Sequence, residues 1–334
     1  MSRMAVVGAG SWGTALAVHL GRVGHDVRVW VREPQLLDQM RQTRQNPWFL
    51  PGIELPPPVR VCGAYDEALD QAAFVVVVVP SHGLRAVARD LSPHVPPGAI
   101  LVSASKGLEG GTLARMSEVI SAEVRGGRPV VVLSGPSFAA EVARGLPTAV
   151  AVASADAAAA ETVQSEFRGP TFRLYTTDDV IGVEIGAALK NVIAIAAGTV
   201  GGLGLGHNAL AALITRGLAE ITRLASAIGG RRETLAGLAG LGDLVLTCTG
   251  SLSRNRHVGA ELGKGRRLEE ILSGMQMVAE GVKTTGAAIA LGERHGVELP
   301  IANQMADVLA GRRDPLAAVE ALMLRPQKVE PEGR

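Results

Sequence analysis

Short apolar runs alternate with amphipathic stretches along the first half of the chain. Runs with the length and valine content of strands buried on both faces cover residues 4–7, 27–31, 74–79, 99–102, 130–133, 149–153 and 172–175. Strands that alternate with helices in this way predict a parallel, doubly wound α/β sheet. Ligands of such sheets bind beyond the carboxyl ends of the strands.

The pattern changes near residue 177, where strand signals largely end and long apolar stretches with helical spacing begin. The first stretch covers residues 178–201, and a GGLGLG segment separates it from a second at 208–228. The sequence therefore predicts two domains. Residues 1–177 are expected to form the sheet domain, and residues 178–334 an all-helical domain.

Two segments contain no candidate catalytic or binding residues. The stretch at 46–60, NPWFLPGIELPPPVR, is rich in proline, and we expect a long surface loop that connects strands. A loop that folds over a bound ligand is the alternative. The tail after Leu324, RPQKVEPEGR, is expected to be disordered.

The helix predicted at 178–201 is apolar on nearly every face and contains two ionisable groups, Glu184 and Lys190. Thr177 or Asp178 is its expected N-cap. Only five of the 33 basic residues are lysines, and an arginine in this place could not release its proton. Burial lowers the pKa of a lysine, so Lys190 is a candidate for proton transfer near neutral pH. The alternative is a structural lysine that reaches solvent or pairs with Glu184.

Charge and composition narrow the class of protein. The net charge of +1 gives no electrostatic support for a nucleic-acid partner. Two cysteines, Cys62 and Cys248, do not form a disulfide framework and suit a reducing compartment, and no metal site is expected. We expect no leader before the first strand, and the charges of Glu184 and Lys190 argue against a membrane span. We expect a soluble cytoplasmic protein.

A glycine motif follows the first predicted strand directly. Gly8, Gly10 and Gly13 form GxGxxG between that strand and a helical stretch, with a second strand after it. In this context the glycines allow a tight turn, close approach to a pyrophosphate and close helix–strand packing. The sequence predicts a Rossmann-type dinucleotide-binding domain.

The end of the second strand selects between the two nicotinamide cofactors. A carboxylate there binds the ribose of NAD, whereas an arginine accepts the 2′-phosphate of NADP. The order here is Arg32 followed by Glu33, which favours NADP while leaving NAD open. The alternative is a surface ion pair without a role in binding.

Polar residues follow several predicted strands. Lys106 and Ser137 come after the strands at 99–102 and 130–133, where the ligand of such a sheet binds. His82 also follows a strand, and a structural role for it is at least as well supported as a catalytic one.

The helical half has a second polar group. Asp243 is expected in a glycine-flanked turn, and Ser253 is the expected N-cap of a helix that ends near residue 263. Arg254, Asn255 and Arg256 occupy its first turn, where cations oppose the helix dipole unless they face an anion. The alternative is a solvated basic turn.

Together these residues suit reduction of a ketone. A lysine of lowered pKa can protonate the developing alkoxide, and Asp243 can hold its ammonium. Lys106, Arg254 and Asn255 can grip a charged substrate handle, either a phosphate or a carboxylate.

A series of motifs follows in order along the chain, namely GAGSWGTALA, VVVVVPSH, SASKGLE, LSGPSFAAEVARGLPTA, GAALKNVIAIAAG, ALITRGLAEI, GLAGLGDLVLTCTGSLSRNR and VAEGVKT. Together these motifs resemble a known family, bacterial NAD(P)-dependent glycerol-3-phosphate dehydrogenase. The resemblance implies a helical domain like the carboxy-terminal domain of 6-phosphogluconate dehydrogenase. It also implies reversible reduction of dihydroxyacetone phosphate to sn-glycerol 3-phosphate, a precursor of phospholipids, by NADPH or NADH.

The resemblance assigns roles residue by residue. It makes Lys190 the proton acceptor in the oxidative direction, with Asn191 beside it. The implied substrate residues are Lys106, Gly135, Ser137, Lys190, Asp243, Ser253, Arg254 and Asn255. The implied cofactor residues, with the glycine motif, are Ser11, Trp12, Arg32, Lys106, Ala139, Arg254, Val278 and Glu280. We expect a homodimer that acts on a small phosphorylated molecule.

Two other functions compete with this one. A β-hydroxyacid dehydrogenase also pairs a nucleotide domain with a helical domain and a Lys-Asn pair, but it needs a carboxylate site, and the SRNR turn favours phosphate. A redox-sensing regulator would explain the glycine motif, but it gives no reason for Lys190, Asp243 and Arg254 together.

Overall fold

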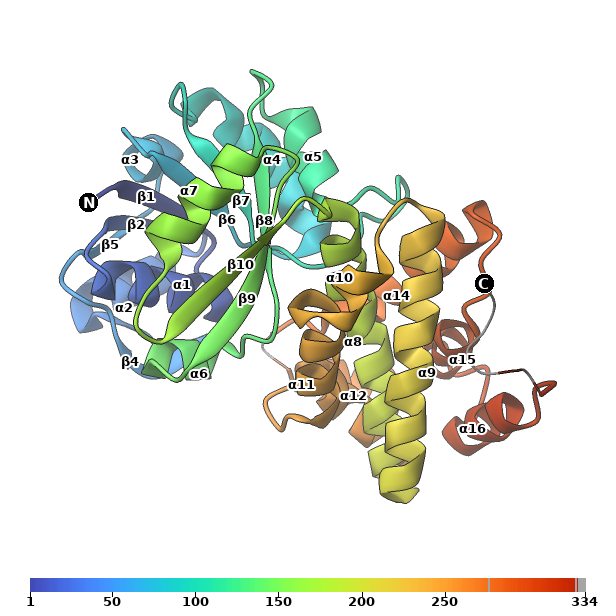
Figure 1. Ribbon diagram of the computed structural model, residues 1–334. Helices are drawn as coiled ribbons and strands as arrows, with labels where there is room; N and C mark the ends of the chain where they lie inside the picture. Colours follow the sequence, from blue (N-terminus) through green and yellow to red (C-terminus); the bar gives the residue numbers. More distant parts are fainter. Residues whose placement is uncertain (276, 328, 330–334) are drawn as a thin grey trace.

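The structure is a computed structural model and describes residues 1–275, 277–327 and 329. A sheet flanked by helices forms the amino-terminal half, and a group of helices forms the carboxy-terminal half (Figure 1). The predicted fold class is confirmed. The disorder expected after Leu324 falls largely on residues 328 and 330–334, which lie outside the described residues.

The strands are β1 (Arg3–Val7), β2 (Asp26–Trp30), β3 (Gln45–Asn46), β4 (Leu50–Glu54), β5 (Val59–Cys62), β6 (Phe74–Val77), β7 (Ile100–Ser103), β8 (Val130–Ser134), β9 (Thr148–Ala153) and β10 (Phe172–Thr177). The helices of the first half are α1 (Ser11–Arg22), α2 (Pro34–Thr43), α3 (Tyr65–Leu69), α4 (Leu84–Leu91), α5 (Met116–Glu123), α6 (Ala139–Arg144) and α7 (Ala157–Phe167), with short 3₁₀ turns η1 (Ser81–Gly83) and η2 (Ser92–His94). The helices of the second half are α8 (Val180–Gly202), α9 (Gly206–Ala227), α10 (Arg232–Ala236), the π-helical segment η3 (Leu238–Gly242), α11 (Asp243–Thr249), α12 (Arg254–Gly263), α13 (Leu268–Ser273), α14 (Glu280–Arg294), α15 (Pro300–Leu309) and α16 (Pro315–Met323).

The main sheet has eight strands in the order β10-β9-β8-β7-β6-β1-β2-β5. Neighbouring strands are parallel except β8 and β9, where Val132 lies opposite Ala153 and Ser134 opposite Ala151. The expectation of a wholly parallel sheet is therefore wrong at this pair, because an apolar run that is buried on both faces carries no information about strand direction.

Side chains of the strands alternate between two cores. On β1, Met4 and Val6 pack into the core that α1, α2, α6 and α7 cover, whereas Ala5 and Val7 pack into the core under α3, α4 and α5. Both faces are buried, which explains the unbroken apolar runs in the sequence. The carboxyl ends of β1, β6, β7 and β8 therefore share one edge of the sheet.

The surface loop predicted at 46–60 is wrong. The segment contains β4 and the last residue of β3, which pair as an antiparallel hairpin, and the first half of β5, which pairs with β2 at the edge of the sheet. The prolines between these strands suggested a loop, but an edge strand tolerates prolines next to it. Asn46 is fully buried and donates from Nδ2 to Ala9 O at 2.7 Å, so the hairpin is attached to the glycine motif.

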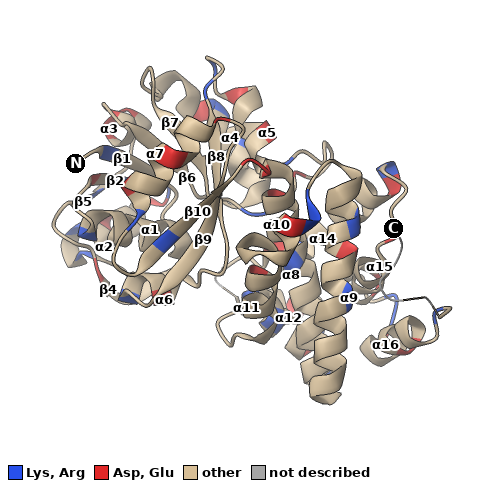
Figure 2. Cartoon of the chain, in the orientation of Figure 1, with Lys and Arg blue, Asp and Glu red and all other residues tan. Residues whose placement is uncertain are grey.

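Helix α8 is the centre of the helical half and packs against α9, α11, α12 and α14. It is long and apolar enough to span a membrane, but 89% of that stretch is buried inside the protein, so it is a core helix. Figure 2 shows it nearly without charged residues. Its N-cap is Asp179, whose side chain accepts from Gly182 N at 2.8 Å, rather than Thr177 or Asp178 as predicted.

Helix α12 crosses α8 with the two backbones in contact. A Cβ added at Gly198 would lie 2.0 Å from Arg256 O, and one added at Gly259 would lie 1.8 Å from Ile195 O. Only glycine permits this approach, which brings the first turn of α12 next to the middle of α8. The glycines of both helices thus position the polar groups described next.

Candidate active site

Lys190 lies in the middle of α8 and is 6% exposed. Its Nζ donates to Asp243 Oδ1 and, at 3.0 Å, to Thr247 Oγ1. Burial lowers the pKa of Lys190 to about 7, against the opposing effect of the Asp243 charge. An ammonium has three protons to donate, and the residues that the structure describes accept two of them. One proton is left for a ligand.

Glu184 does not pair with Lys190, so that alternative is wrong. The Glu184 carboxylate instead accepts hydrogen bonds from Arg115 Nη1 at 2.7 Å and Ser117 Oγ at 2.6 Å. Asp243, from another helix, is the partner of the lysine.

Asp243 is shared by two lysines. Lys106 Nζ donates to Asp243 Oδ2 at 2.7 Å and to Gly135 O at 3.3 Å. Burial alone would raise the pKa of Asp243, but the charges of Lys106 and Lys190 outweigh it and hold this pKa below its usual value. Two ammonium groups around one carboxylate leave a net charge of +1, which suits an anionic ligand.

Asp243 begins α11 instead of lying in a turn as predicted, and η3 precedes it. A helix places residues four apart on one face, so Asp243 and Thr247 both point toward Lys190. Thr247 Oγ1 donates to Asp243 O at 2.6 Å, which leaves its lone pairs for the ammonium. The sequence interpretation missed Thr247. The four-residue spacing would have revealed it had Asp243 been assigned to a helix.

The first turn of α12 faces α8. Ser253 caps the helix as predicted, since its Oγ accepts from Arg256 N at 3.2 Å. Asn255 Nδ2 donates to Asn191 Oδ1 at 3.0 Å, and Asn255 Oδ1 accepts from Gly281 N at 2.9 Å. Asn255 therefore joins α12 to α8 beside Lys190 and to the start of α14.

Arg254 has a different environment from its neighbours. The residue is exposed to solvent. Protein nevertheless surrounds its guanidinium closely enough that desolvation lowers the pKa of Arg254, and the Glu280 charge acts in the opposite direction. Among the described residues no acidic side chain forms an ion pair with Arg254. A guanidinium in this setting can bind an anion bidentately.

Gly135 and Ser137 follow β8, at the sheet edge where Lys106 follows β7. Ser137 Oγ donates to Gly135 O at 3.0 Å, the same carbonyl that Lys106 contacts. Gly135 has φ +149, and an added Cβ would lie 2.9 Å from Val150 Cα, so a larger residue would displace this carbonyl.

The GxGxxG motif fits a dinucleotide. A Cβ added at Gly8 would lie 2.5 Å from Val78 O, and one added at Gly13 would lie 2.0 Å from Gly8 O. At Gly10 a Cβ would meet nothing within 4 Å, so open space faces this residue. These are the three roles that a nucleotide-binding turn requires. Helix α1 begins directly after Gly10 without a side-chain cap, which leaves its first N–H groups for a pyrophosphate.

Other predicted cofactor residues lie around this turn. Ser11 Oγ donates to Phe49 O at 2.7 Å and lies 3.1 Å from Met277 Sδ. Trp12 Nε1 is buried without a hydrogen-bond partner in the described structure, so its N–H is an unsatisfied donor next to the glycine motif. The contact with Phe49, in the segment expected to be a loop, was not anticipated.

At the end of β2, Arg32 and Glu33 form a surface ion pair. Glu33 Oε1 accepts from Arg32 Nε at 2.9 Å and from Nη2 at 2.6 Å, and the arginine side chain is 74% exposed. A 2′-phosphate would have to compete with Glu33 for this guanidinium. The Arg32–Glu33 pair therefore does not decide between NADP and NAD in the structure, just as its order along the chain did not.

The helical half reaches the sheet edge through the start of α14. Glu280 Oε2 accepts from Ser81 Oγ at 2.7 Å, and Val278 just before it is 37% exposed. Ala139 is half-buried at the start of α6. Ser81 was not predicted, although it lies next to His82, whose pKa is lowered by burial and by the Lys283 charge.

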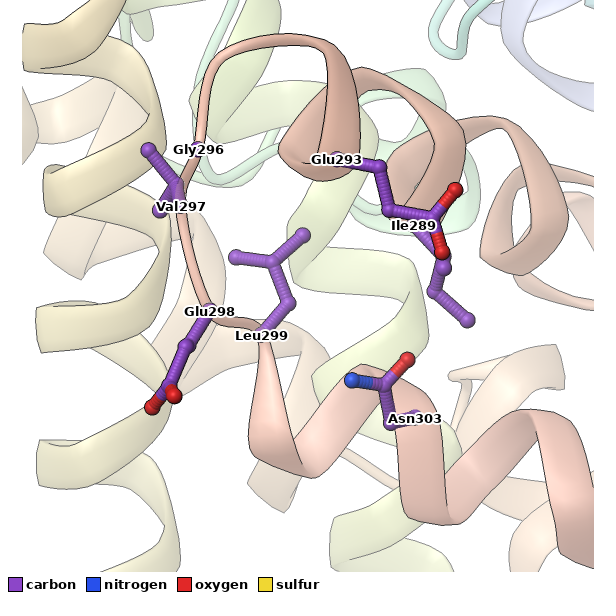
Figure 3. Close-up of a pocket in the computed structure, with 7 residues that line it drawn as sticks. All are labelled: Ile289, Glu293, Gly296, Val297, Glu298, Leu299 and Asn303. Carbon is purple, nitrogen blue, oxygen red and sulfur yellow. The ribbon is translucent and has the colours of Figure 1, made fainter.

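Two cavities lie away from Lys190 and the glycine motif. One, of about 240 Å³, is bounded by α14, by the connection from α14 to α15, and by α15 (Figure 3). Leu299, the N-cap of α15, and Asn303 within α15 contribute to its wall. The other, of about 840 Å³, lies beside α5 and the start of α8. No group of three or more metal-ligating side chains occurs in the described part of the chain. Cys248 is fully buried, and burial raises the pKa of its thiol to about 12, so it is inert.

Comparison with known proteins places this arrangement in a family. Residues 3–160 match the family model described as NAD-dependent glycerol-3-phosphate dehydrogenase N-terminus, and residues 179–320 match the corresponding C-terminus. This chain belongs to the NAD-dependent glycerol-3-phosphate dehydrogenase family. It is therefore an oxidoreductase that uses NAD or NADP, as the motifs predicted.

Individual relatives of the glycerol-3-phosphate dehydrogenase family match over nearly their whole length. Glycerol-3-phosphate dehydrogenase (NAD(P)+) of Koribacter versatilis is 55% identical over 334 residues, 99% of this chain and 99% of that protein. The protein of the same name from Geobacter sulfurreducens is 54% identical, over 98% of each chain. The crystal structure of glycerol-3-phosphate dehydrogenase from Coxiella burnetii superposes with a TM-score of 0.93 at 41% identity, over 97% of this chain and 99% of that one.

Proposed function

We propose that this chain reduces dihydroxyacetone phosphate to sn-glycerol 3-phosphate, reversibly, with NADPH or NADH. The observation that carries the proposal is the buried amine of Lys190, held by Asp243 and Thr247 with one proton unused. The bound dinucleotide supplies the hydride that reduces the carbonyl carbon. The chain itself has to bind the phosphate, orient the ketone and deliver a proton to its oxygen.

Lys190 is the proposed proton donor in reduction and proton acceptor in oxidation. Its pKa of about 7 lets it occupy either state near neutral pH. When Lys190 donates its proton, Lys106 and Asp243 remain as one positive and one negative charge, so the site changes from +1 to neutral. The positive charge around the ketone before transfer stabilises the developing alkoxide.

The remaining site residues are proposed to hold the two ligands. Lys106, Gly135, Ser137, Asp243, Ser253, Arg254 and Asn255 are the proposed substrate residues. The GxGxxG glycines, Ser11, Trp12, Arg32, Lys106, Ala139, Arg254, Val278 and Glu280 are the proposed cofactor residues. The open space at Gly10 and the uncapped start of α1 support the second group. The guanidinium of Arg254, which forms no ion pair with the described residues, supports a phosphate handle in the first group.

We also propose the two-domain division at residues 177 and 178. The last strand, β10, ends at Thr177, and every element that follows in the described chain is a helix. The family models match residues 3–160 and 179–320, and the proposed boundary lies in the interval between these two matches.

We also propose the location, the assembly and the metabolic role of the enzyme. Two free, buried cysteines suit the cytoplasm. A homodimer is the proposed assembly, and Leu205, just before α9, is a large apolar side chain at 36% exposure that suits such a contact. Supply of sn-glycerol 3-phosphate for phospholipid synthesis is the proposed role, since this molecule is the backbone of those lipids.

One assay tests the proposed reaction. The purified chain is mixed with NADPH or NADH and either dihydroxyacetone phosphate or a 3-oxoacid, and cofactor oxidation is followed by absorbance. We expect turnover with dihydroxyacetone phosphate and little with the oxoacid. Preference for the oxoacid would contradict the proposed substrate.

A further inference from the structure

Glu184 is a buried carboxyl group that the proposed chemistry does not use; burial raises its pKa, and the Arg115 charge and the Ser117 hydrogen bonds oppose this effect. Its side chain is 4% exposed on α8, six residues before Lys190. Its carboxylate accepts from Arg115 Nη1 at 2.7 Å, Ser117 N at 2.8 Å and Ser117 Oγ at 2.6 Å. All of these donors come from the sheet half of the chain, so Glu184 joins the two halves.

Arg115 is the last residue of the segment that carries Lys106, here called the Lys106 loop (residues 104–115), and Ser117 is the second residue of α5, which follows directly. Leu108 and Arg115 form an antiparallel bridge, and Glu109 N donates to Ala114 O at 3.0 Å, so the two ends of the loop are held together. A shift of Arg115 therefore passes directly to Leu108, two residues from Lys106.

Packing attaches the same loop to the helical half. Leu108 and Leu113 are 4% and 9% exposed, and they belong to the core that Ile185 and Leu189 of α8 help to form. Helix α8 thus contacts the loop through apolar groups and through Glu184, and about 9 Å further along its axis it carries Lys190. Asp243 then connects Lys190 to Lys106.

Stability alone does not account for the Glu184 pair. Replacing a buried ion pair by apolar groups of similar volume is often neutral or stabilising, because both charges lose hydration on burial. The Lys106 loop already has two leucines in the helical core. What the ion pair adds is direction, since three hydrogen bonds from Arg115 and Ser117 to one carboxylate fix the position where the Lys106 loop ends and α5 begins.

We propose that Glu184, acting through Arg115 and Ser117, is a positioning residue that sets the spacing between Lys106 and Lys190 across Asp243. The proposal rests on the reduction of dihydroxyacetone phosphate proposed above. Reacting groups displaced by about 1 Å can lose about 10²-fold in rate, so a loop released from Glu184 is expected to impair substrate turnover.

The test variant is Glu184→Gln, which keeps the size of the side chain and removes its charge. We expect kcat/KM for dihydroxyacetone phosphate to fall by about 10–100-fold, with the dissociation constant of NADPH, from fluorescence titration, unchanged. The matched control is Glu118→Gln, because Glu118 accepts from the same arginine, Arg115, at 2.7 Å but is 52% exposed. It should retain wild-type kinetics.

A kinetic double-mutant cycle with Lys106→Met separates positioning from a general structural effect. If Glu184 acts through Lys106, Glu184→Gln should lower kcat/KM by less than about 3-fold in the Lys106→Met background. The same loss in both backgrounds, or no loss in the wild-type background, would overturn the proposal. If Glu184→Gln does not fold, Ser117→Ala, which removes one donor, takes its place in the cycle with the same expectations.

The activity of the wild-type chain separates failure of the proposed reaction from failure of the positioning role. An inactive wild type would remove the proposed reaction itself. An active wild type with independent effects of Glu184 and Lys106 would remove only the positioning role.

Discussion

Replacing Arg254 tests whether the site recognises a phosphate. The change Arg254→Met removes the charge and keeps an extended side chain. Arg254 has solvent contact and, in the described chain, no acidic partner in an ion pair, so its guanidinium is available to a ligand. Surrounding protein partly desolvates the guanidinium and lowers its pKa, and hydrogen bonds of charged groups are stronger in such a setting.

The expected magnitude follows from one charge-assisted hydrogen bond. Such a bond contributes about 1.5–3 kcal/mol, which corresponds to a factor of about 10–150 in kcat/KM. A bidentate contact would place the loss at the upper end of this range or above it. The loss should appear with dihydroxyacetone phosphate and be much smaller with dihydroxyacetone, which has no phosphate.

The assay compares kcat/KM for both ketones at saturating NADPH in the wild type and the variant. Arg266→Met is the control, because it removes a charge beyond the end of α12, where Arg266 pairs with Glu261. An equal loss with both ketones would show that Arg254 does not act on the phosphate. Unchanged constants would remove Arg254 from the site.

Three further predictions concern cofactor choice and pH. Arg32→Ala should weaken NADPH more than NADH in fluorescence titrations, because only NADPH carries the 2′-phosphate; equal losses would show that Arg32 does not bind it. Oxidation of sn-glycerol 3-phosphate requires neutral Lys190, so kcat/KM should rise with pH up to about 7 and then level off; a rate independent of pH there would contradict that role. Burial raises the pKa of Glu220 from 4.5 to about 7 even though its carboxylate accepts from Ile301 N and Ala302 N. Its contribution to the free energy of unfolding is thus complete below pH 4.5 and declines as pH rises to about 7, by up to about 1.4 kcal/mol per unit, and Glu220→Gln should abolish this decline in urea titrations. An identical pH dependence in the variant would refute the assignment.

The sheet half was largely predictable because its signals are local. Apolar runs gave the strands, and the spacing of Gly8, Gly10 and Gly13 after β1 gave the nucleotide turn. The direction of β9 and the strands hidden in the proline-rich segment were not predictable. Strand direction and edge pairing depend on partners far away in the sequence, which periodicity does not record.

The site was predictable in its residue types and less so in its connections. Lys190 stood out because it is an ionisable group in an apolar helix, and its partner Asp243 was named correctly. Thr247 was missed since Asp243 was assigned to a turn instead of to a helix. The true partners of Glu184 are 67 and 69 residues away, and no local pattern connects them.

The most direct test of the whole account is turnover by a Lys190→Met variant. The rate constant for reduction of dihydroxyacetone phosphate is measured at saturating NADPH, together with the dissociation constant of NADPH. Loss of the proton donor should lower kcat by about 10²–10⁴-fold while NADPH binds as in the wild type. A variant that turns over as fast as the wild type would contradict the claim that Lys190 transfers the proton.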